Sequence, residues 1–299
     1  MSARIVFTAA LVLASCTASS AQVPAPAEVV PVATEWASAC EDWDEWDKPG
    51  PPFRIHGNTW YVGTCGIGAI LITGDAGHIL IDSGTEAGAE IVLQNIAKLG
   101  FDVRDVRYLL HSHEHFDHVG GMAKLKAATH AWLLSSTHAE PVLRSGIADG
   151  SDPQAAQLPK MEPIEVYQTI SDTGTVVLGD IRLTAHETPG HTAGALSWQW
   201  RSCDKGECIT IVYADSLSPV SSDGYRFSDH PQYVAAYREG IARVAALDCD
   251  ILLTPHPSAS GMRDKLLADG LASGMNCREY ASAITARLDA RLAQEAQTK

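Results

Sequence analysis

The sequence predicts an α/β protein in which two β-sheets are covered by helices on their outer faces. The chain has 299 residues, of which 45% are hydrophobic, so it is long enough for one large domain. Short apolar runs separated by glycine turns alternate with segments of helical periodicity. This alternation occurs in each half of the chain, which favours two layered sheets.

In the first half, strands precede a helix and one further strand. Residues 59–84 predict successive short strands joined by glycine turns. Residues 85–100 have apolar side chains at helical spacing and end at Gly100, which predicts a helix with a glycine cap. Val106 to Leu110 then form a short apolar run, which predicts a buried strand.

The second half repeats this order. Residues 173–188 predict a hairpin that turns at Gly179-Asp180, and residues 195–216 predict another hairpin. A helix over residues 233–247, a strand over residues 250–256 and a final helix from Cys277 to Gln297 are expected to follow.

The N-terminus has the features of a secretory signal peptide, predicted over residues 1–21. An apolar run of ten residues follows one arginine and is too short to cross a membrane. Small residues before Gln22 offer a signal-peptidase site, whereas Leu13 to Cys16 fit a lipobox that would leave a lipid on Cys16. Both alternatives predict export and a periplasmic location.

The remaining chain is expected to form a tether and one domain. Residues 22–35 are rich in proline and alanine, which is typical of a flexible or extended tether. No second linker or internal repeat follows, so residues 36–299 are predicted to be a single domain. The net charge is −14 and lysines and arginines do not cluster, which argues against nucleic acid as a partner.

Six cysteines besides Cys16 indicate disulfides, because their number is even and the compartment is oxidising. Six cysteines allow 15 pairings. Sequence proximity favours Cys203–Cys208, and the simplest completion is Cys40–Cys65 with Cys249–Cys277. A zinc-thiolate cluster is the alternative, but the chain has no C-x-x-C pair.

The most informative stretch follows the strand that ends at Leu110 and reads His113-Glu114-His115-Phe116-Asp117-His118. On an extended segment, alternate side chains point the same way, so His113, His115 and Asp117 can converge. A bend would let His118 serve an adjacent second site. Imidazole and carboxylate suit zinc, and also iron or manganese.

Two further histidines occupy similar places in the chain. His191 lies in a glycine-rich turn after a predicted hairpin, and His256 ends an apolar strand between two prolines. Catalytic residues concentrate on loops at strand ends. The chain therefore offers six candidate ligands.

This ordered set of motifs resembles the metallo-β-lactamase superfamily. The motifs are H-x-H-x-D-H, then T-P-G-H-T, Y-A-D-S and T-P-H, over residues 55 to 260, and they look most like subclass B3. The resemblance implies the four-layer αββα fold, with two mixed β-sheets sandwiched between helices, and two zinc ions per chain. It implies the following ligands: His113, His115 and His191 for the first zinc, and Asp117, His118 and His256 for the second.

The resemblance also implies a function. A zinc-bound hydroxide would open the β-lactam amide of penicillins, cephalosporins and carbapenems, conferring antibiotic resistance. Asp117 would be both ligand and catalytic residue that aims the hydroxide. Ser216 and Ser218 would hold the substrate carboxylate, and the residues between 145 and 165, including Gln154 and Gln157, would form a loop beside the site. The chain is expected to act as a monomer.

Two other functions remain open. Some hydrolases of the superfamily, such as glyoxalase II and the acyl-homoserine lactonases, have an aspartate that bridges both metals, and Asp215 stands in that motif. A bridging Asp215 would favour a thioester or lactone hydrolase. A non-catalytic zinc-binding envelope protein is the third possibility, against which the complete ligand set argues.

Overall fold

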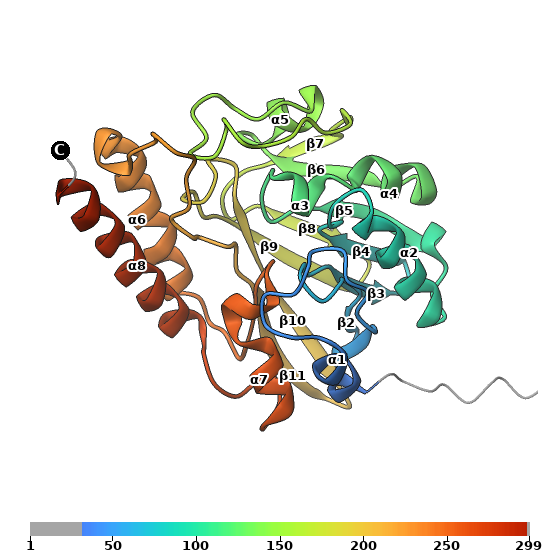
Figure 1. Ribbon diagram of the computed structural model, residues 1–299. Coiled ribbons are helices and arrows are strands. Elements are labelled where there is room, and N and C mark those ends of the chain that lie inside the picture. Colours follow the sequence, from blue (N-terminus) through green and yellow to red (C-terminus); the bar gives the residue numbers. More distant parts are fainter. Residues whose placement is uncertain (1–31, 298–299) are drawn as a thin grey trace, which may run out of the picture.

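The computed structural model describes residues 32–297, and in it two mixed β-sheets pack face to face with helices on both outer sides (Figure 1). Helices α6 and α8 lie side by side against one sheet, and α2 and α4 lie on the far side of the other. The predicted four-layer α/β arrangement is therefore confirmed.

The first sheet has seven strands in the order of the sequence, from β1 to β7. Strands β1 to β4 pair antiparallel, and β4 to β7 pair parallel. Their bounds are β1 Phe53–His56, β2 Thr59–Tyr61, β3 Ile70–Gly74, β4 Gly77–Ile81, β5 Val106–Leu110, β6 Trp132–Ser136 and β7 Gln168–Ile170.

The second sheet has five strands in the order β12-β11-β10-β9-β8. All neighbours pair antiparallel except β11 and β12, which are parallel. Their bounds are β8 Thr175–Leu178, β9 Ile181–Glu187, β10 Leu196–Asp204, β11 Glu207–Tyr213 and β12 Ile251–Leu253. The β8–β9 hairpin turns at Gly179-Asp180 as predicted, and Gly179 adopts a φ of +60°, which a residue with a side chain rarely tolerates.

Eight α-helices connect and flank these strands. Their bounds are α1 Ala33–Ala39, α2 Gly88–Lys98, α3 Phe116–Val119, α4 Met122–Thr129, α5 Glu140–Ser145, α6 Pro231–Ala245, α7 Met262–Leu267 and α8 Cys277–Gln297. Three short 3₁₀ helices, η1 Val103–Asp105, η2 Phe227–Asp229 and η3 Pro257–Ser260, complete the structure. The predicted strand at Val106–Leu110 and the predicted helix at Cys277–Gln297 have these same bounds.

Three hydrophobic layers correspond to the three interfaces of the sandwich. The largest lies between the sheets and includes Trp198, which is fully buried and donates from Nε1 to the backbone oxygen of His111 at 2.8 Å. The other two lie between each sheet and its helices. Because apolar side chains fill all three, the strand ends that carry polar residues are held in fixed positions.

The start of the domain differs from the prediction by a few residues. Helix α1 begins at Ala33, and its Trp36 is 1% exposed and packs edge-on against Tyr61 at 5.5 Å between ring centroids. Residues 33–35 thus belong to the fold and not to the expected tether. The predicted signal peptide, Cys16 and most of the tether lie outside the described residues.

Three disulfides join the cysteines in the pairs that sequence proximity suggests: Cys40–Cys65, Cys203–Cys208 and Cys249–Cys277. The second closes the β10–β11 hairpin across directly opposed residues. The third fixes the first residue of α8 to the segment that follows α6.

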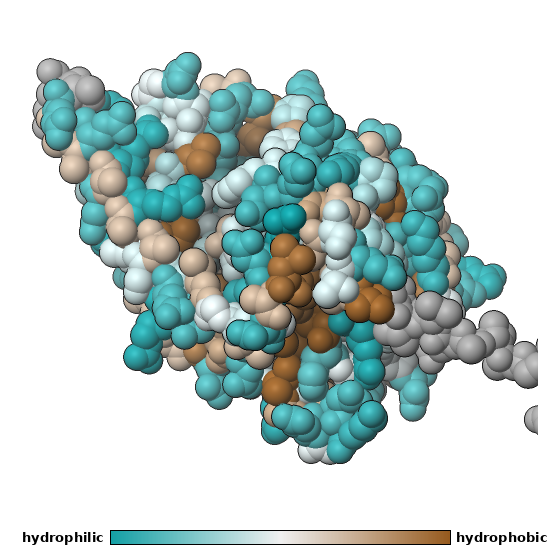
Figure 2. Space-filling view, turned by 60° about the horizontal axis from the view of Figure 1, so that its bottom comes forward, coloured by the Kyte–Doolittle hydropathy of each residue, from teal (hydrophilic) through white to brown (hydrophobic). Residues whose placement is uncertain are grey.

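The face of the molecule shown in Figure 2 is mainly polar. Its longest run of hydrophobic residues forms a vertical band near the centre, and smaller hydrophobic patches lie apart from it. Within residues 32–297, no helix is both long enough and apolar enough to cross a membrane.

Removing the Cys249–Cys277 disulfide is expected to destabilise the protein more than removing Cys203–Cys208. The first closes a loop of 28 residues and the second a loop of 5. Chain-entropy arguments give about 3.5 kcal/mol and about 2 kcal/mol respectively for the loss in free energy of unfolding. Urea denaturation of the two double alanine variants measures both losses, and an equal or reversed order would contradict the argument.

Candidate metal centre and substrate cleft

The candidate site lies where several strands end on one edge of the sandwich. Asp82 follows β4, His113 follows β5, Asp215 follows β11 and His256 follows β12. Carboxyl ends of parallel strands meet at the same sheet edge, which brings the β4 and β5 residues together, as it does those of β11 and β12. The packing of the two sheets then places both groups around one point.

The H-x-H-x-D-H segment bends instead of staying extended. His115 is the N-cap of α3, a single helical turn that contains Asp117 and His118. The expectation that His113, His115 and Asp117 alternate along an extended segment is therefore wrong beyond His115. Because of this bend, one loop supplies ligand residues to two neighbouring groups.

Glycine after this turn is a packing requirement. A Cβ on Gly121 would lie 2.4 Å from the Cβ of Ala89 in α2 and 2.7 Å from the backbone oxygen of Thr85. Such distances are far below van der Waals contact, so only glycine permits α2 to approach the turn. The paired glycines therefore position the ligand loop against its neighbouring helix.

The first group consists of His113, His115 and His191, whose candidate ligand nitrogens lie within 4.8 Å of one another. Gln154 Nε2 lies 3.5 Å from Nδ1 of His115 and 3.4 Å from Nε2 of His191. The two imidazole nitrogens therefore face a common point. This is the set expected for the first metal.

The second group consists of His113, Asp117 and His118, within the same 4.8 Å limit. Oδ2 of Asp117 lies 3.0 Å from Nε2 of His118 and 3.4 Å from Nε2 of His256. The structure thus brings all six expected ligand residues together, with His256 at the edge of the second group.

The donor set fits a metal ion. Nε2 of His113 is buried and makes no hydrogen bond within residues 32–297, although its other nitrogen is bonded. A buried polar atom without a partner costs free energy unless a ligand satisfies it. Imidazoles and one carboxylate in this number are the ligands that zinc takes in hydrolytic sites.

Each histidine of the first group has a hydrogen-bond acceptor beside its other ring nitrogen. Asp215 Oδ1 lies 2.8 Å from Nδ1 of His113, and Asp152 Oδ2 lies 2.9 Å from Nε2 of His115. The backbone oxygen of Ser218 lies 2.9 Å from Nδ1 of His191. Such partners fix the tautomer and the ring orientation of a metal-binding histidine.

Asp215 is therefore a supporting residue. One of its carboxylate oxygens bonds His113 and the other accepts from the backbone N of Leu217 at 3.1 Å. It contacts the nitrogen of His113 that faces away from the ligand groups. This position does not fit an aspartate that bridges two metals.

Asp82 and Asp152 were not recognised from the sequence. Asp82 is fully buried and accepts from Ser112 N at 2.6 Å and from the Tyr213 hydroxyl at 2.8 Å. It also lies 3.6 Å from Nδ1 of His118. An aspartate directly after an apolar strand was the available signal for Asp82, whereas Asp152 lies in an irregular loop that gives no such signal.

Glu114 connects the first motif to the loop of His191. Its carboxylate is buried and accepts from the Thr192 hydroxyl at 2.7 Å and from the backbone N of Gly194 at 3.0 Å. Burial raises its pKa. Glu114 thus points away from the ligand groups and fixes the distance between two ligand-bearing loops.

The pKa values of Asp117 and His118 shift in opposite directions. Burial opposes ionisation of Asp117, but the adjacent His118 outweighs it and holds the pKa of Asp117 well below its usual value. Burial likewise lowers the pKa of His118, yet Asp117 and Asp82 raise it to about 10. Each of the two side chains thus favours the charged form of the other. A histidine binds a metal in its neutral form, so metal binding at His118 is expected to release a proton.

A cleft of about 490 Å³ opens over the ligand groups. Its lining includes Gln154 and Gln157 from the irregular segment between α5 and β7, so the loop predicted over residues 145–165 does border the site. Ser216 and Ser218 line it too. The Oγ of Ser216 is buried and has no hydrogen-bond partner in the described chain.

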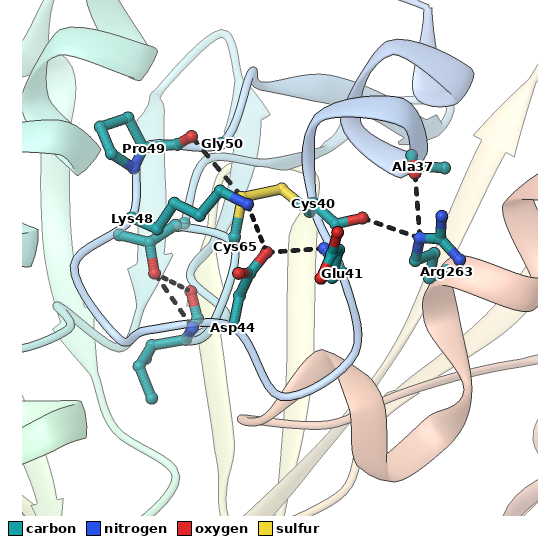
Figure 3. The surroundings of a disulfide bond; sticks show 12 residues. Ala37, Cys40, Glu41, Asp44, Lys48, Pro49, Gly50, Cys65 and Arg263 are labelled. Atoms are coloured by element: carbon teal, nitrogen blue, oxygen red, sulfur yellow. Dashed lines mark hydrogen bonds and ion pairs between the residues drawn. A yellow bond between two sulfur atoms is a disulfide. The ribbon is translucent and has the colours of Figure 1, made fainter.

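Two tryptophans form one rim of this cleft. Trp43 and Trp46 are 68% and 42% exposed, and Trp46 packs edge-on against Phe116 at 5.3 Å between ring centroids. Their loop is fixed by the Cys40–Cys65 disulfide and by Asp44, which accepts from Glu41 N and from Lys48 Nζ (Figure 3). Exposed indoles on a fixed loop present apolar surface to whatever enters the cleft.

Three other histidines have structural places. His111 is buried and its Nε2 lies 2.9 Å from the hydroxyl of Ser135. His138 is exposed, and His230 precedes α6 and stacks on Tyr225 at 4.6 Å. None of these three belongs to a ligand group.

Comparisons with known proteins agree with this geometry. A model of the metallo-beta-lactamase superfamily matches residues 62–204. The solved structure of the MIM-2 metallo-beta-lactamase is 58% identical, with a TM-score of 0.84, and the match covers 88% of this chain and 98% of that one. MIM-1 from Novosphingobium pentaromativorans is 47% identical, with a TM-score of 0.86, over 89% and 99% of the two chains.

Two further similarities are weaker. MEM-A1, a subclass B3 metallo-beta-lactamase from a soil metagenome library, is 41% identical, with a TM-score of 0.81, over 85% of this chain and all of that one. A hydroxyacylglutathione hydrolase of Rhodospirillum rubrum is 28% identical over 110 residues, which are 37% of this chain and 34% of that protein. This match thus spans about a third of that hydrolase.

Replacing Asp215 by asparagine is expected to weaken zinc binding by about 10- to 100-fold, because His113 loses the carboxylate that orients it. Competition with a chromophoric chelator measures the affinity. Asp180→Asn, at the exposed β8–β9 turn, is the matched control. Affinity equal to that of the control would show that Asp215 does not support the metal.

Proposed function

This chain belongs to the metallo-β-lactamase superfamily and is most like its subclass B3, and on that basis we propose that it is a zinc-dependent hydrolase of β-lactams. The observation that carries the proposal is the convergence of six ligand residues beneath one cleft, in a chain 58% identical to MIM-2. Penicillins, cephalosporins and carbapenems are the proposed substrates, and resistance to them is the proposed consequence.

Two zinc ions are the proposed cofactors. His113, His115 and His191 would hold one ion, and Asp117, His118 and His256 the other. Bound zinc supplies a Lewis acid for the amide carbonyl and lowers the pKa of water to about 7. The hydrogen bonds behind His113, His115 and His191 support this assignment, because they leave one nitrogen of each ring available.

Asp117 is the residue that would orient the attacking water. Its Oδ2 faces His118 and His256, and its Oδ1 has no hydrogen bond within residues 32–297, so Oδ1 is available to accept from that water. The water oxygen adds to the lactam carbonyl carbon, the C–N bond breaks, and a proton passes to the nitrogen. The single ring-opened product carries a carboxylate and an amine.

The two serines have different parts in this proposal. Ser216 presents a buried hydroxyl without a partner to the cleft, so it can donate to the substrate carboxylate. Ser218 holds His191 through its backbone oxygen, and its Oγ lies 3.2 Å from the same nitrogen. The main role of Ser218 is therefore to support the ligand His191, and it also borders the cleft.

The position of Asp215 disfavours the thioester or lactone hydrolase. That alternative depends on a bridging aspartate, whereas both oxygens of Asp215 are bonded behind His113. The match to the hydroxyacylglutathione hydrolase is also short. We propose a periplasmic location from the signal-like N-terminus, with or without a lipid on Cys16, and mass spectrometry of the exported protein tests this.

Hydrolysis of a carbapenem and a cephalosporin by the purified protein is the direct test. Absorbance should fall as the lactam opens, a chelator should stop the reaction, and added zinc should restore it. Turnover that persists in chelator after the metal content reaches zero would exclude the proposed mechanism. Absence of turnover with two zinc ions verified by elemental analysis would redirect the search to thioesters and lactones.

The Asp117→Ala variant is expected to lose about 10²- to 10⁴-fold in kcat, because the water loses its hydrogen-bond acceptor. Folding should be little affected, since Asp117 lies at the cleft and outside the hydrophobic layers. Steady-state kinetics at saturating zinc measures kcat, and thermal unfolding checks the fold. A variant that keeps most of its rate would show that Asp117 does not orient the water.

A further inference from the structure

Arg287 of α8 lies at the rim of the cleft, and among residues 32–297 it is the one lysine or arginine in the lining. A β-lactam of the proposed classes carries a carboxylate beside its lactam ring. We propose that Arg287 is a substrate-binding residue that pairs with this carboxylate together with Ser216. This inference rests on the proposed function and identifies the residue that anchors the substrate by binding its carboxylate.

Arg287 is exposed. Within residues 32–297 its guanidinium makes no hydrogen bond or ion pair. Neighbouring arginines are paired: Arg291 Nε lies 2.7 Å from Glu295 Oε1, and Arg238 lies 2.5 Å from Asp289 Oδ1. A guanidinium without a protein partner is free to form a two-pronged pair with an incoming carboxylate.

Helix α8 is fixed to the segment that carries Ser216. The hydroxyl of Tyr280 donates to the backbone oxygen of Asp215 at 2.9 Å and is also bonded to that of Ser216. Arg287 follows Tyr280 by seven residues, or two helical turns, so both lie on the same face of the helix. The Cys249–Cys277 disulfide holds the start of α8, which limits independent movement of this face.

The net negative charge of the protein gives a positively charged residue at the cleft a role in binding an anion. At a net charge of −14, an anionic substrate is repelled by most of the surface. The metal ligands lie at the base of the cleft, where the lactam reacts, whereas Arg287 lies on the helix at its rim. A positive group there attracts the anion and orients it, with the carboxylate toward α8.

The test compares a β-lactam with its own methyl ester, which lacks the negative charge. Arg287→Ala should raise KM for the free acid by about five- to tenfold with little change in kcat, and should leave KM for the ester unchanged. The KM of Arg287→Lys for the free acid should lie between those of the wild type and Arg287→Ala. KM of the wild type for the acid should also rise with salt more steeply than that of Arg287→Ala.

Arg278→Ala is the matched control, because it removes the same charge from an exposed position on the same helix, outside the lining of the cleft. A similar rise in KM in this control, or equal effects on acid and ester, would overturn the pairing and leave only a general charge effect. Zinc content should remain equal in all variants.

Failure of this inference can be told from failure of the proposed function. If the wild type hydrolyses the acid and Arg287→Ala has the same KM, only the role of Arg287 is refuted. A zinc-loaded wild type that hydrolyses neither acid nor ester refutes the proposed function, and the anchor with it.

Discussion

A hydrogen-bond acceptor on the ring nitrogen that faces away from the metal fixes the tautomer and the orientation of a metal-binding histidine. Here that acceptor is Asp215 for His113, Asp152 for His115 and a backbone oxygen for His191. Each acceptor comes from a different part of the chain. The pair of His113 and Asp215 joins the end of β5 in the first sheet to the end of β11 in the second, so the two sheets must pack in one relative position before His113 can point correctly.

The same requirement explains several features away from the ligands. Glu114 links two ligand loops through buried hydrogen bonds, and Asp82 joins the ends of β4, β5 and β11. Tyr280 and Tyr237 tie α8 and α6 to the segment from Asp215 to Leu217. The helical layer is thus part of the support of the site, and one of its helices also supplies the basic group at the cleft rim.

The site combines opposite charge environments at short range. Asp117 and His118 stabilise each other's charged forms, whereas burial and the adjacent His115 lower the pKa of His191 to about 3. A neutral imidazole is the form that binds a metal. Burial also holds the pKa of His113 well below its usual value, so His113 and His191 are ready for a metal without losing protons, whereas His118 must release one.

The sequence by itself determined the alternation of strands and helices, the six ligand residues and the pairs of cysteines. Apolar periodicity indicates the strands and helices, the motifs around the histidines indicate the ligands, and proximity along the chain indicates the cysteine pairs. Only the tertiary structure decided that the chain bends into a helical turn at Phe116, that Asp215 supports His113, and that Asp82, Asp152 and Arg287 belong to the site. The physical reason is that these features have no distinctive pattern along the chain and depend on contacts that exist only after the sheets and helices have packed.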